Sequence, residues 1–160
     1  RNELIINTIR KHLSNQRKII ILSDRRSHCE HLHREIQNTL PDFTSGLYMG
    51  GMKQSDLKLS EDCNVILATY SLAHEGLDIP TLDTLILTTP KTDIVQSCGR
   101  ILRETSGKKN NPLIIDIFDS YASLPNQAQK RKKYYINSGF HINGMKNVVK
   151  KEAGYSFIND

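Results

Sequence analysis

The sequence predicts an α/β fold, a doubly wound and mainly parallel sheet with helices on both faces. Short apolar runs such as "KIIILS" recur along the chain, and their continuous hydrophobicity is typical of strands buried on both faces. Segments with apolar residues at helical spacing lie between some of these runs. Strands that alternate with helices form parallel sheets with right-handed crossovers, which gives the predicted fold class.

The apolar patterns define the individual elements. We predict strands over residues 19–22, 46–48, 64–69, 84–87 and 113–118. We predict amphipathic helices over residues 3–13 and 29–40, and a third helix over about 93–102, with a polar turn over residues 23–28.

Length and composition fit an ordinary globular protein. The chain has 160 residues, of which 38% are hydrophobic and 24% are charged, and its formal net charge is +5. We expect one domain over residues 1–160, with a core over about 1–125 and a basic C-terminal extension over about 126–160. Three well-separated cysteines favour reduced thiols in an intracellular protein, in the cytoplasm or nucleus. We expect no membrane span and no signal peptide, because no apolar run is long enough.

The loops that follow the strands are the candidate functional segments. Ligands bind to doubly wound sheets at the carboxyl ends of the strands. Each predicted strand is followed at once by polar, glycine or charged residues, in "SDRRS", "MGGMK", "YSLAHEGLDIP", "TTPKTD" and "DSYASLP". The sequence therefore collects its chemistry along one edge of the sheet.

The segment "KTDIVQSCGRILRETS" places two arginines on one predicted helix behind the fourth strand. Thr92 suits the N-cap position and Asp93 suits the first turn. Offsets of four and three residues place Gln96, Arg100 and Arg103 on one face of this helix.

Two interpretations of this helix face remain open. Three long polar side chains on one stripe would suit a polyanion such as a triphosphate, because arginine offers a permanent charge and a fixed fork of donors. Gly99 costs about 1 kcal/mol relative to alanine inside a helix, which suggests that something approaches closely. The alternative is an exposed basic face whose charges are paired with Glu104 and solvent.

Several segments together resemble the superfamily 2 helicases over about residues 18–118. "KIIILSD" resembles motif IV, "GLYMGG" resembles motif IVa, and "ATYSLAHEGLDIP" and "QSCGRILR" resemble motifs V and VI. The Gln-x-x-Gly-Arg-x-x-Arg pattern is fairly specific when it follows "EGLDIP". The segment "EGLDIPTLDTLIL" looks most like the XPB-type, phage and large-DNA-virus branch of this superfamily. This branch includes poxvirus-type transcript-release helicases, so the resemblance allows a virus-encoded protein.

This resemblance implies the second RecA-like lobe of an ATP-dependent helicase or translocase, a P-loop NTPase-type fold without its P-loop. It favours DNA over RNA as the nucleic-acid partner. Arg100 and Arg103 would be arginine fingers that reach ATP across a cleft, and Gln96 would orient the nucleotide or an arginine. The implied nucleotide-binding residues are Glu75, Gly76 and Asp78. The implied residues of the strand-binding groove are Ser23, Arg25, Gly50, Gly51 and Thr69.

Two signatures that ATP hydrolysis requires are missing from the sequence. The chain has no Gly-x-x-x-x-Gly-Lys-Ser/Thr loop and no Asp-Glu-x-His/Asp sequence. The resemblance implies that ATP with Mg²⁺ is held mainly by a first RecA-like lobe of the same polypeptide, and we expect this chain alone to be inactive. No cysteine pair lies near His28, His31 and His33, so we expect solvated helix histidines and no metal site.

The positive charge of the chain is a property of its C-terminal part. Residues 120–151 hold seven basic and no acidic residues, so the rest of the chain, with 15 basic and 17 acidic residues, carries −2. A basic segment attracts phosphate backbones, although a solvated helix with lysines pointing at water is the plainer interpretation. The candidates for an accessory nucleic-acid contact are Lys130, Arg131, Lys132 and Lys133.

Two other classes of protein remain open. The chain could be a non-catalytic RecA-like module whose arginines only grip nucleic acid, and a P-loop upstream of Arg1 would argue against this class. It could also be an unrelated doubly wound nucleotide or sugar-nucleotide enzyme. That class requires a glycine-rich turn after the first strand, and "SDRRSH" has no glycine.

Overall fold

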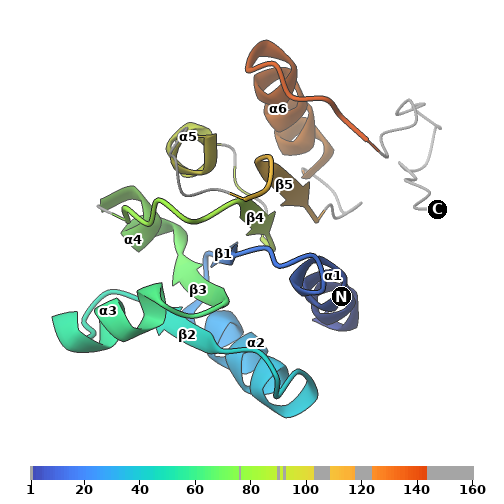
Figure 1. Cartoon of the computed structure of the whole chain (residues 1–160). Coiled ribbons are helices and arrows are strands. Elements are labelled where there is room, and N and C mark those ends of the chain that lie inside the picture. Colours follow the sequence, from blue (N-terminus) through green and yellow to red (C-terminus); the bar gives the residue numbers. More distant parts are fainter. Residues whose placement is uncertain are drawn as a thin grey trace. The chain divides into compact units, whose positions relative to one another are not determined.

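Five parallel strands form the centre of the computed structural model (Figure 1). Their order in the sheet is β2-β3-β1-β4-β5, and all four strand pairs are parallel. This arrangement confirms the predicted doubly wound α/β fold. The strands are β1 (Ile19–Ser23), β2 (Ser45–Tyr48), β3 (Val65–Thr69), β4 (Thr84–Leu87) and β5 (Leu113–Asp116).

The structure describes residues 2–75, 77–89, 91, 93–102, 109–117 and 124–143. For residues 73–75, 96, 100–102 and 124–126 it describes only the backbone. The statements below concern these residues.

Helices cover both faces of the sheet (Figure 1). α1 and α2 lie against one face, and α3, α4 and α5 lie on the opposite side. The helices are α1 (Asn2–Leu13), α2 (Arg26–Thr39), α3 (Gln54–Glu61), α4 (Tyr70–Glu75), α5 (Val95–Leu102) and α6 (Leu124–Asn137).

The residues of β1 show why this strand is central. It is hydrogen-bonded to β3 on one side and to β4 on the other. Ile19 and Ile21 point into the core cluster with α1 and α2, while the alternate residues, Ile20 and Leu22, are also at most 2% exposed. The continuous apolar run over residues 19–22 therefore correctly predicted a strand that is buried on both faces.

The chain divides into two compact units. Unit 1 comprises residues 1–89 and 96–117 and contains the sheet. Unit 2 comprises residues 90–95 and 118–160 and contains α6. The first residue of α5, Val95, belongs to unit 2. The rest of α5, from Gln96 onward, belongs to unit 1.

Some predicted boundaries were wrong by a few residues. α2 begins at Arg26, so the expected polar turn over residues 23–28 is only partly a turn. β5 ends at Asp116, two residues before the predicted end of this strand. Asp93 precedes α5, and its Oδ1 accepts a hydrogen bond of 3.3 Å from the Val95 amide. Thr92, the predicted N-cap, lies outside the described residues.

A close approach between β2 and α3 depends on a glycine. A Cβ atom at Gly46 would lie 2.7 Å from the Cα of Ser60. The Ser60 hydroxyl donates a hydrogen bond of 2.7 Å to the carbonyl of Leu47. The helix therefore packs directly on the backbone of this strand.

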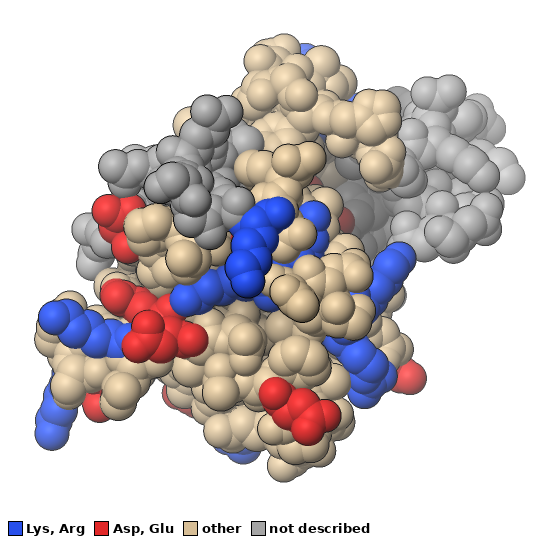
Figure 2. All heavy atoms as spheres, viewed as in Figure 1, with Lys and Arg blue, Asp and Glu red and all other residues tan. Residues whose placement is uncertain are grey.

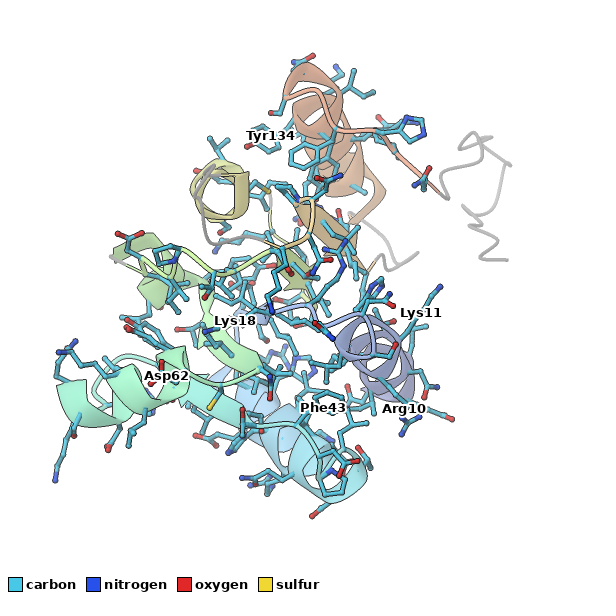
Figure 3. The ribbon with its side chains drawn as sticks, viewed as in Figure 1. Arg10, Lys11, Lys18, Phe43, Asp62 and Tyr134 are labelled. Atoms are coloured by element: carbon cyan, nitrogen blue, oxygen red, sulfur yellow. The ribbon has the colours of Figure 1, made fainter. Side chains whose placement is uncertain are left out.

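Basic and acidic side chains lie interspersed on the face of unit 1 seen in Figure 2. Figure 3 labels Lys18 and Asp62, which lie just before β1 and β3, in the same view. The Lys18 ammonium donates a hydrogen bond to the carbonyl of Glu61, at the end of α3. This amino-terminal edge of the sheet is consolidated by contacts within the chain.

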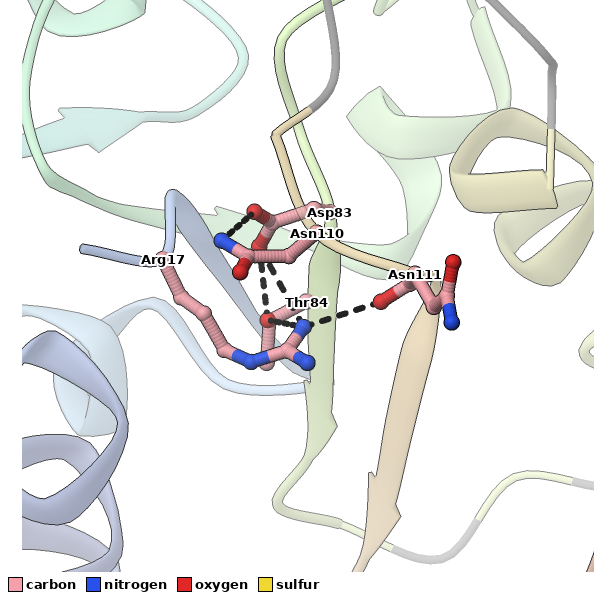
Figure 4. Close-up of polar contacts among 5 residues, drawn as sticks. All are labelled: Arg17, Asp83, Thr84, Asn110 and Asn111. Carbon is pink, nitrogen blue, oxygen red and sulfur yellow. Dashed lines mark hydrogen bonds and ion pairs between the residues drawn. The ribbon is translucent and has the colours of Figure 1, made fainter. Parts of the chain in front are cut away.

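A second set of contacts at the same edge centres on Asp83 (Figure 4). Arg17 Nη1 lies 3.7 Å from Asp83 Oδ1 and donates hydrogen bonds of 3.2 Å to Thr84 Oγ1 and 3.0 Å to the carbonyl of Asn111. The Thr84 hydroxyl and the Asn110 amide donate to the two Asp83 oxygens at 2.8 and 2.9 Å. The arginine thereby joins the starts of β1, β4 and β5.

We predict that Arg17→Met lowers the free energy of unfolding by about 3 kcal/mol, because it leaves the buried Asp83 carboxylate without its cation. Urea unfolding of the purified chain, followed by circular dichroism, measures this change. Arg10→Met is the matched control, since Arg10 is exposed on α1 and bonds only Asn7 among the contacts described. We expect the control to change stability by no more than about 0.5 kcal/mol. Equal effects of the two variants would contradict this account.

Candidate nucleotide and nucleic-acid interface at the carboxyl edge of the sheet

The carboxyl ends of the central strands lie side by side. Ser23, the last residue of β1, is the register partner of Thr69, the last residue of β3. The loops that follow both strands therefore leave the sheet from the same place, which is where doubly wound sheets bind ligands. The structure brings these two predicted site residues together.

Hydrogen bonds hold the loops after β1, β3 and β4 to one another. The amide and the hydroxyl of Thr88 both donate to the carbonyl of Leu22, at 3.0 and 2.8 Å. The Asp24 amide donates to Thr89 Oγ1 at 2.9 Å, and the Tyr70 hydroxyl donates to the Thr89 carbonyl at 3.0 Å. These contacts within the chain order the loops at this edge.

Sequence reasoning missed this role of Thr88, Thr89 and Tyr70. The available signal was the pair of threonines in "LTTP", directly after an apolar strand. Thr88 is fully buried and Tyr70 is 2% exposed, so both act inside the protein.

Ser23 was predicted to line the strand-binding groove, but its side chain is fully buried. Its Oγ lies 3.0 Å from His28 Nδ1 and accepts a hydrogen bond of 3.3 Å from the Arg25 amide. The other ring nitrogen of His28 lies 3.3 Å from Asn2 Oδ1. The Ser23 hydroxyl therefore orders the turn into α2 and holds the backbone of Arg25.

Arg25 and the turn after β2 are exposed at the same edge. Arg25 precedes the first residue of α2, and Gly50 and Gly51 follow Met49. Gly51 has a φ of +81°, a conformation that favours glycine. Arg26 donates a hydrogen bond to the carbonyl of Gly50, so α2 holds this turn in place. A Cβ atom at either glycine would meet nothing within 4 Å, so the backbone is open to an approaching group.

Thr69 and Asp78 differ in their access to solvent. Thr69 is 8% exposed, and its Oγ1 lies 3.2 Å from Ser71 Oγ in the first turn of α4. Asp78 is exposed. Gly76 lies outside the described residues, and only the backbone of Glu75 is described, at the end of α4.

α5 carries the predicted arginine segment and presents one buried face to unit 1. Cys98 is fully buried, and burial followed by the nearby Asp116 carboxylate raises the pKa of its thiol to about 12. Gly99 is exposed, and a Cβ atom there would meet nothing within 4 Å. The backbones of Gln96 and Arg100 lie in α5, whereas Arg103 lies outside the described residues.

The histidines expected to be solvated are in part packed against other groups. His31 is exposed, but His33 Nδ1 lies 2.9 Å from Ser45 Oγ, and burial followed by Arg34 lowers the pKa of His33. Among the described residues, no group of three or more His, Cys, Asp or Glu side chains could hold a metal ion.

The basic run on α6 in unit 2 is not uniformly exposed. Lys130 and Lys133 are exposed and Lys132 is half-buried. Arg131 is 3% exposed, and its Nη1 donates a hydrogen bond of 2.9 Å to the Lys91 carbonyl. Arg131, one of the four candidates for an accessory nucleic-acid contact, is therefore buried, whereas Lys130 and Lys133 are exposed. No described helix is long and apolar enough to cross a membrane.

The parallel sheet, the loops at its carboxyl edge and the helix after β4 fit a RecA-like fold, which solved helicase-domain structures share. Residues 1–105 match the family described as "Helicase conserved C-terminal domain", and the chain belongs to this family. This family match confirms the helicase C-terminal resemblance that the motifs predicted.

A relative and two solved structures show the extent of the similarity. The chain is 38% identical over 146 residues to a protein of Acanthamoeba polyphaga mimivirus that carries the provisional name ATP-dependent RNA helicase. The match covers 89% of this chain and 28% of the relative, so the chain spans about a quarter of that protein. The C-terminal part of the Fun30 ATPase domain matches with a TM-score of 0.64 and 14% identity, over 80% of this chain and 43% of the other. Domain 2 of the DEAD-box helicase Mss116p, bound to an RNA duplex, matches with a TM-score of 0.56 and 16% identity, over 71% and 48% of the two chains.

We predict that Cys63 is alkylated first when the folded chain is treated with iodoacetamide at neutral pH. Cys63 is half-buried, whereas burial raises the pKa of Cys29 to about 11 and that of Cys98 to about 12, which keeps both as unreactive thiols. Mass spectrometry of tryptic peptides at successive times measures the order. All three thiols should react alike in urea. Modification of Cys98 as fast as Cys63 in the folded chain would show that α5 is not seated as described.

Proposed function

We propose that the chain supplies half of an ATPase site and part of a strand-binding groove in an ATP-dependent nucleic-acid helicase. The observation that carries this proposal is the placement of α5. This helix follows β4 of a RecA-like sheet and has one face buried at Cys98, so its other faces can serve a second lobe. Arg100 and Arg103 would then act as arginine fingers toward the phosphates of ATP, and Gln96 would orient them or the nucleotide.

The chemistry assigned to the arginines is electrostatic. A guanidinium aimed at the phosphoryl group stabilises charge that develops during transfer, and such fingers contribute about 10³–10⁵ to kcat. Glu75, Gly76 and Asp78, at the end of α4 and just after it, would contact the nucleotide from the same lobe. The P-loop and the carboxylates that hold Mg²⁺ would belong to a first lobe of the same polypeptide. The open space at Gly99 is compatible with close approach of that lobe.

The nucleic-acid groove would be formed by the loops at the carboxyl edge. Arg25 and the backbone of Gly50 and Gly51 are exposed there, and Thr69 lies at the end of the neighbouring strand. These groups suit phosphate contacts, which fix a strand without reading its sequence. Ser23 would support this groove from inside by holding the Arg25 backbone.

Three observations bear on the class of nucleic acid that the full-length protein would bind. The resemblance of the segment "EGLDIPTLDTLIL" favours DNA. The mimivirus relative is provisionally named an RNA helicase, and the Mss116p domain is bound to an RNA duplex. ATPase stimulation of the full-length protein by single-stranded DNA, duplex DNA and RNA would decide between them.

We predict that Arg100→Ala and Arg103→Ala each lower the kcat of nucleic-acid-stimulated ATP hydrolysis by about 10³ or more in the full-length protein. Nucleic-acid affinity should change by less than about threefold, because the arginines are assigned to ATP rather than to the strand. Steady-state ATPase assays and fluorescence anisotropy measure the two quantities. Arg34→Ala, a change of an exposed arginine on α2, is the matched control.

The alternative class is a RecA-like module that binds nucleic acid without catalysis. Wild-type turnover in both arginine variants would remove the finger assignment, and loss of nucleic-acid binding alone would favour the module. The isolated 160-residue chain should hydrolyse no ATP in either case. Hydrolysis by the isolated chain would contradict the division of the site between two lobes.

We also propose an accessory phosphate contact by Lys130, Lys132 and Lys133 on α6. Lys130→Ala/Lys133→Ala should reduce the slope of log K against log salt concentration by about 2 if both lysines contact phosphates. Lys11→Ala/Lys58→Ala removes the same charge from exposed sites on α1 and α3 and is the control. A slope that falls equally in both double variants, or in neither, would argue against a contact at α6.

A further inference from the structure

The buried face of α6 contains an arginine where the pattern calls for an apolar residue. Ala128, Arg131 and Tyr135 are 4%, 3% and 7% exposed and lie three and four residues apart, which places them on one stripe of the helix. Lys130 and Lys133 are exposed. An arginine is rarely buried unless its donors are satisfied, so a stripe with Arg131 in its middle requires acceptors.

One acceptor of Arg131 is identified. Its Nη1 donates a hydrogen bond of 2.9 Å to the backbone carbonyl of Lys91, forty residues earlier in the chain. Lys91 belongs to the short segment 90–95, which groups with residues 118–160 in unit 2. The buried guanidinium therefore joins α6 to the segment that leads into α5.

Local contacts order the C-terminal end of α6. The rings of Tyr134 and Tyr135 lie edge to face, as do those of Tyr135 and Phe140, with both centroid distances 6.0 Å. Gly139 ends the helix with a φ of +78°, and the Phe140 amide donates a hydrogen bond of 3.0 Å to the Tyr135 carbonyl. Figure 3 labels Tyr134 on this helix. These local contacts order the end of the helix that carries Arg131.

The segment held by Arg131 is short and leads directly into the arginine helix. α5 begins at Val95, whose amide donates to Asp93 Oδ1 at 3.3 Å. Gln96 is the second residue of α5 and Arg100 the sixth. A chain advances at most about 3.3–3.6 Å per residue, so an anchor at Lys91 limits where the start of α5 can lie.

We propose that Arg131 is a positioning residue for ATP hydrolysis, which holds the Lys91–Val95 segment and thereby sets the start of α5. This inference rests on the proposed function, because it matters only if Arg100 and Arg103 act on ATP. It assigns Arg131 a role different from its lysine neighbours, which are the candidates for phosphate contact. Loss of the anchor misplaces catalytic groups without removing any of them.

The test compares Arg131→Met, Arg131→Lys and Gln129→Met in the full-length protein. Met keeps the apolar stem without the donors, and Lys keeps the charge without the planar fork. Gln129 is exposed on the same helix and is the matched control. We expect Arg131→Met to lower kcat by about tenfold or more with little change in KM for ATP, Arg131→Lys to be intermediate, and Gln129→Met to match wild type.

Hydrogen exchange distinguishes positioning from general damage. In Arg131→Met, amides of residues 91–95 should exchange faster while those of α6 keep their protection. The nucleic-acid affinity and its salt dependence should stay unchanged, because a buried guanidinium contacts no phosphate. If Arg131→Met unfolds α6, the Lys variant decides the question, and wild-type kcat in that variant overturns the inference.

Other outcomes also decide between the proposals. Wild-type kcat in a folded Arg131→Met, or a fall in kcat without faster exchange in residues 91–95, overturns the positioning role. If Arg100→Ala and Arg103→Ala are inactive at the same time, the proposed function stands without it. If Arg100→Ala and Arg103→Ala are both active, the proposed function itself fails.

Discussion

The burial of β1 between β3 and β4 is the constraint on which the rest of the lobe depends. All five residues of this strand are at most 2% exposed, and the strand is hydrogen-bonded on both sides. Helices cover both faces, so polar chemistry can appear only where the strands end. Parallel strands place all those ends at one edge, and the functional loops gather there for this reason.

The two edges of the sheet serve different purposes. At the amino-terminal edge, Arg17 and Asp83 join the starts of three strands through contacts made within the chain. At the carboxyl edge, Thr88 and Thr89 tie loops together while Arg25 and the turn at Gly50 stay exposed. A stable frame at one edge thus presents ordered but accessible backbone at the other.

The strands could be predicted from the sequence because each is a continuous apolar run followed at once by polar residues. Boundaries were harder where polar residues begin a helix, as at Arg26, since a polar helix start looks like a turn. The motif resemblance identified the family from short patterns in the right order. It also nominated Ser23, whose burial could not be read from the sequence because any Ser at a strand end can point either way.

The burial of Arg131 within the basic run on α6 could not be predicted from the sequence. Arg131 stands among three lysines, and only the fold separates it from them by turning it onto the buried stripe of α6. Its acceptor is a backbone carbonyl forty residues away, which no side-chain pattern reveals. Arg100 and Arg103 were predicted as a pair from spacing and resemblance alone, and the roles proposed for them require a second lobe.

The most direct test of the central claim is an experimental structure of the full-length protein with nucleic acid, Mg²⁺ and ADP–aluminium fluoride. The account predicts that a guanidinium nitrogen of Arg100 or Arg103 lies about 2.7–3.2 Å from a fluoride that occupies the position of the transferred phosphoryl oxygens. Both guanidiniums directed instead at nucleic-acid phosphates, or at carboxylates of their own lobe, would contradict it.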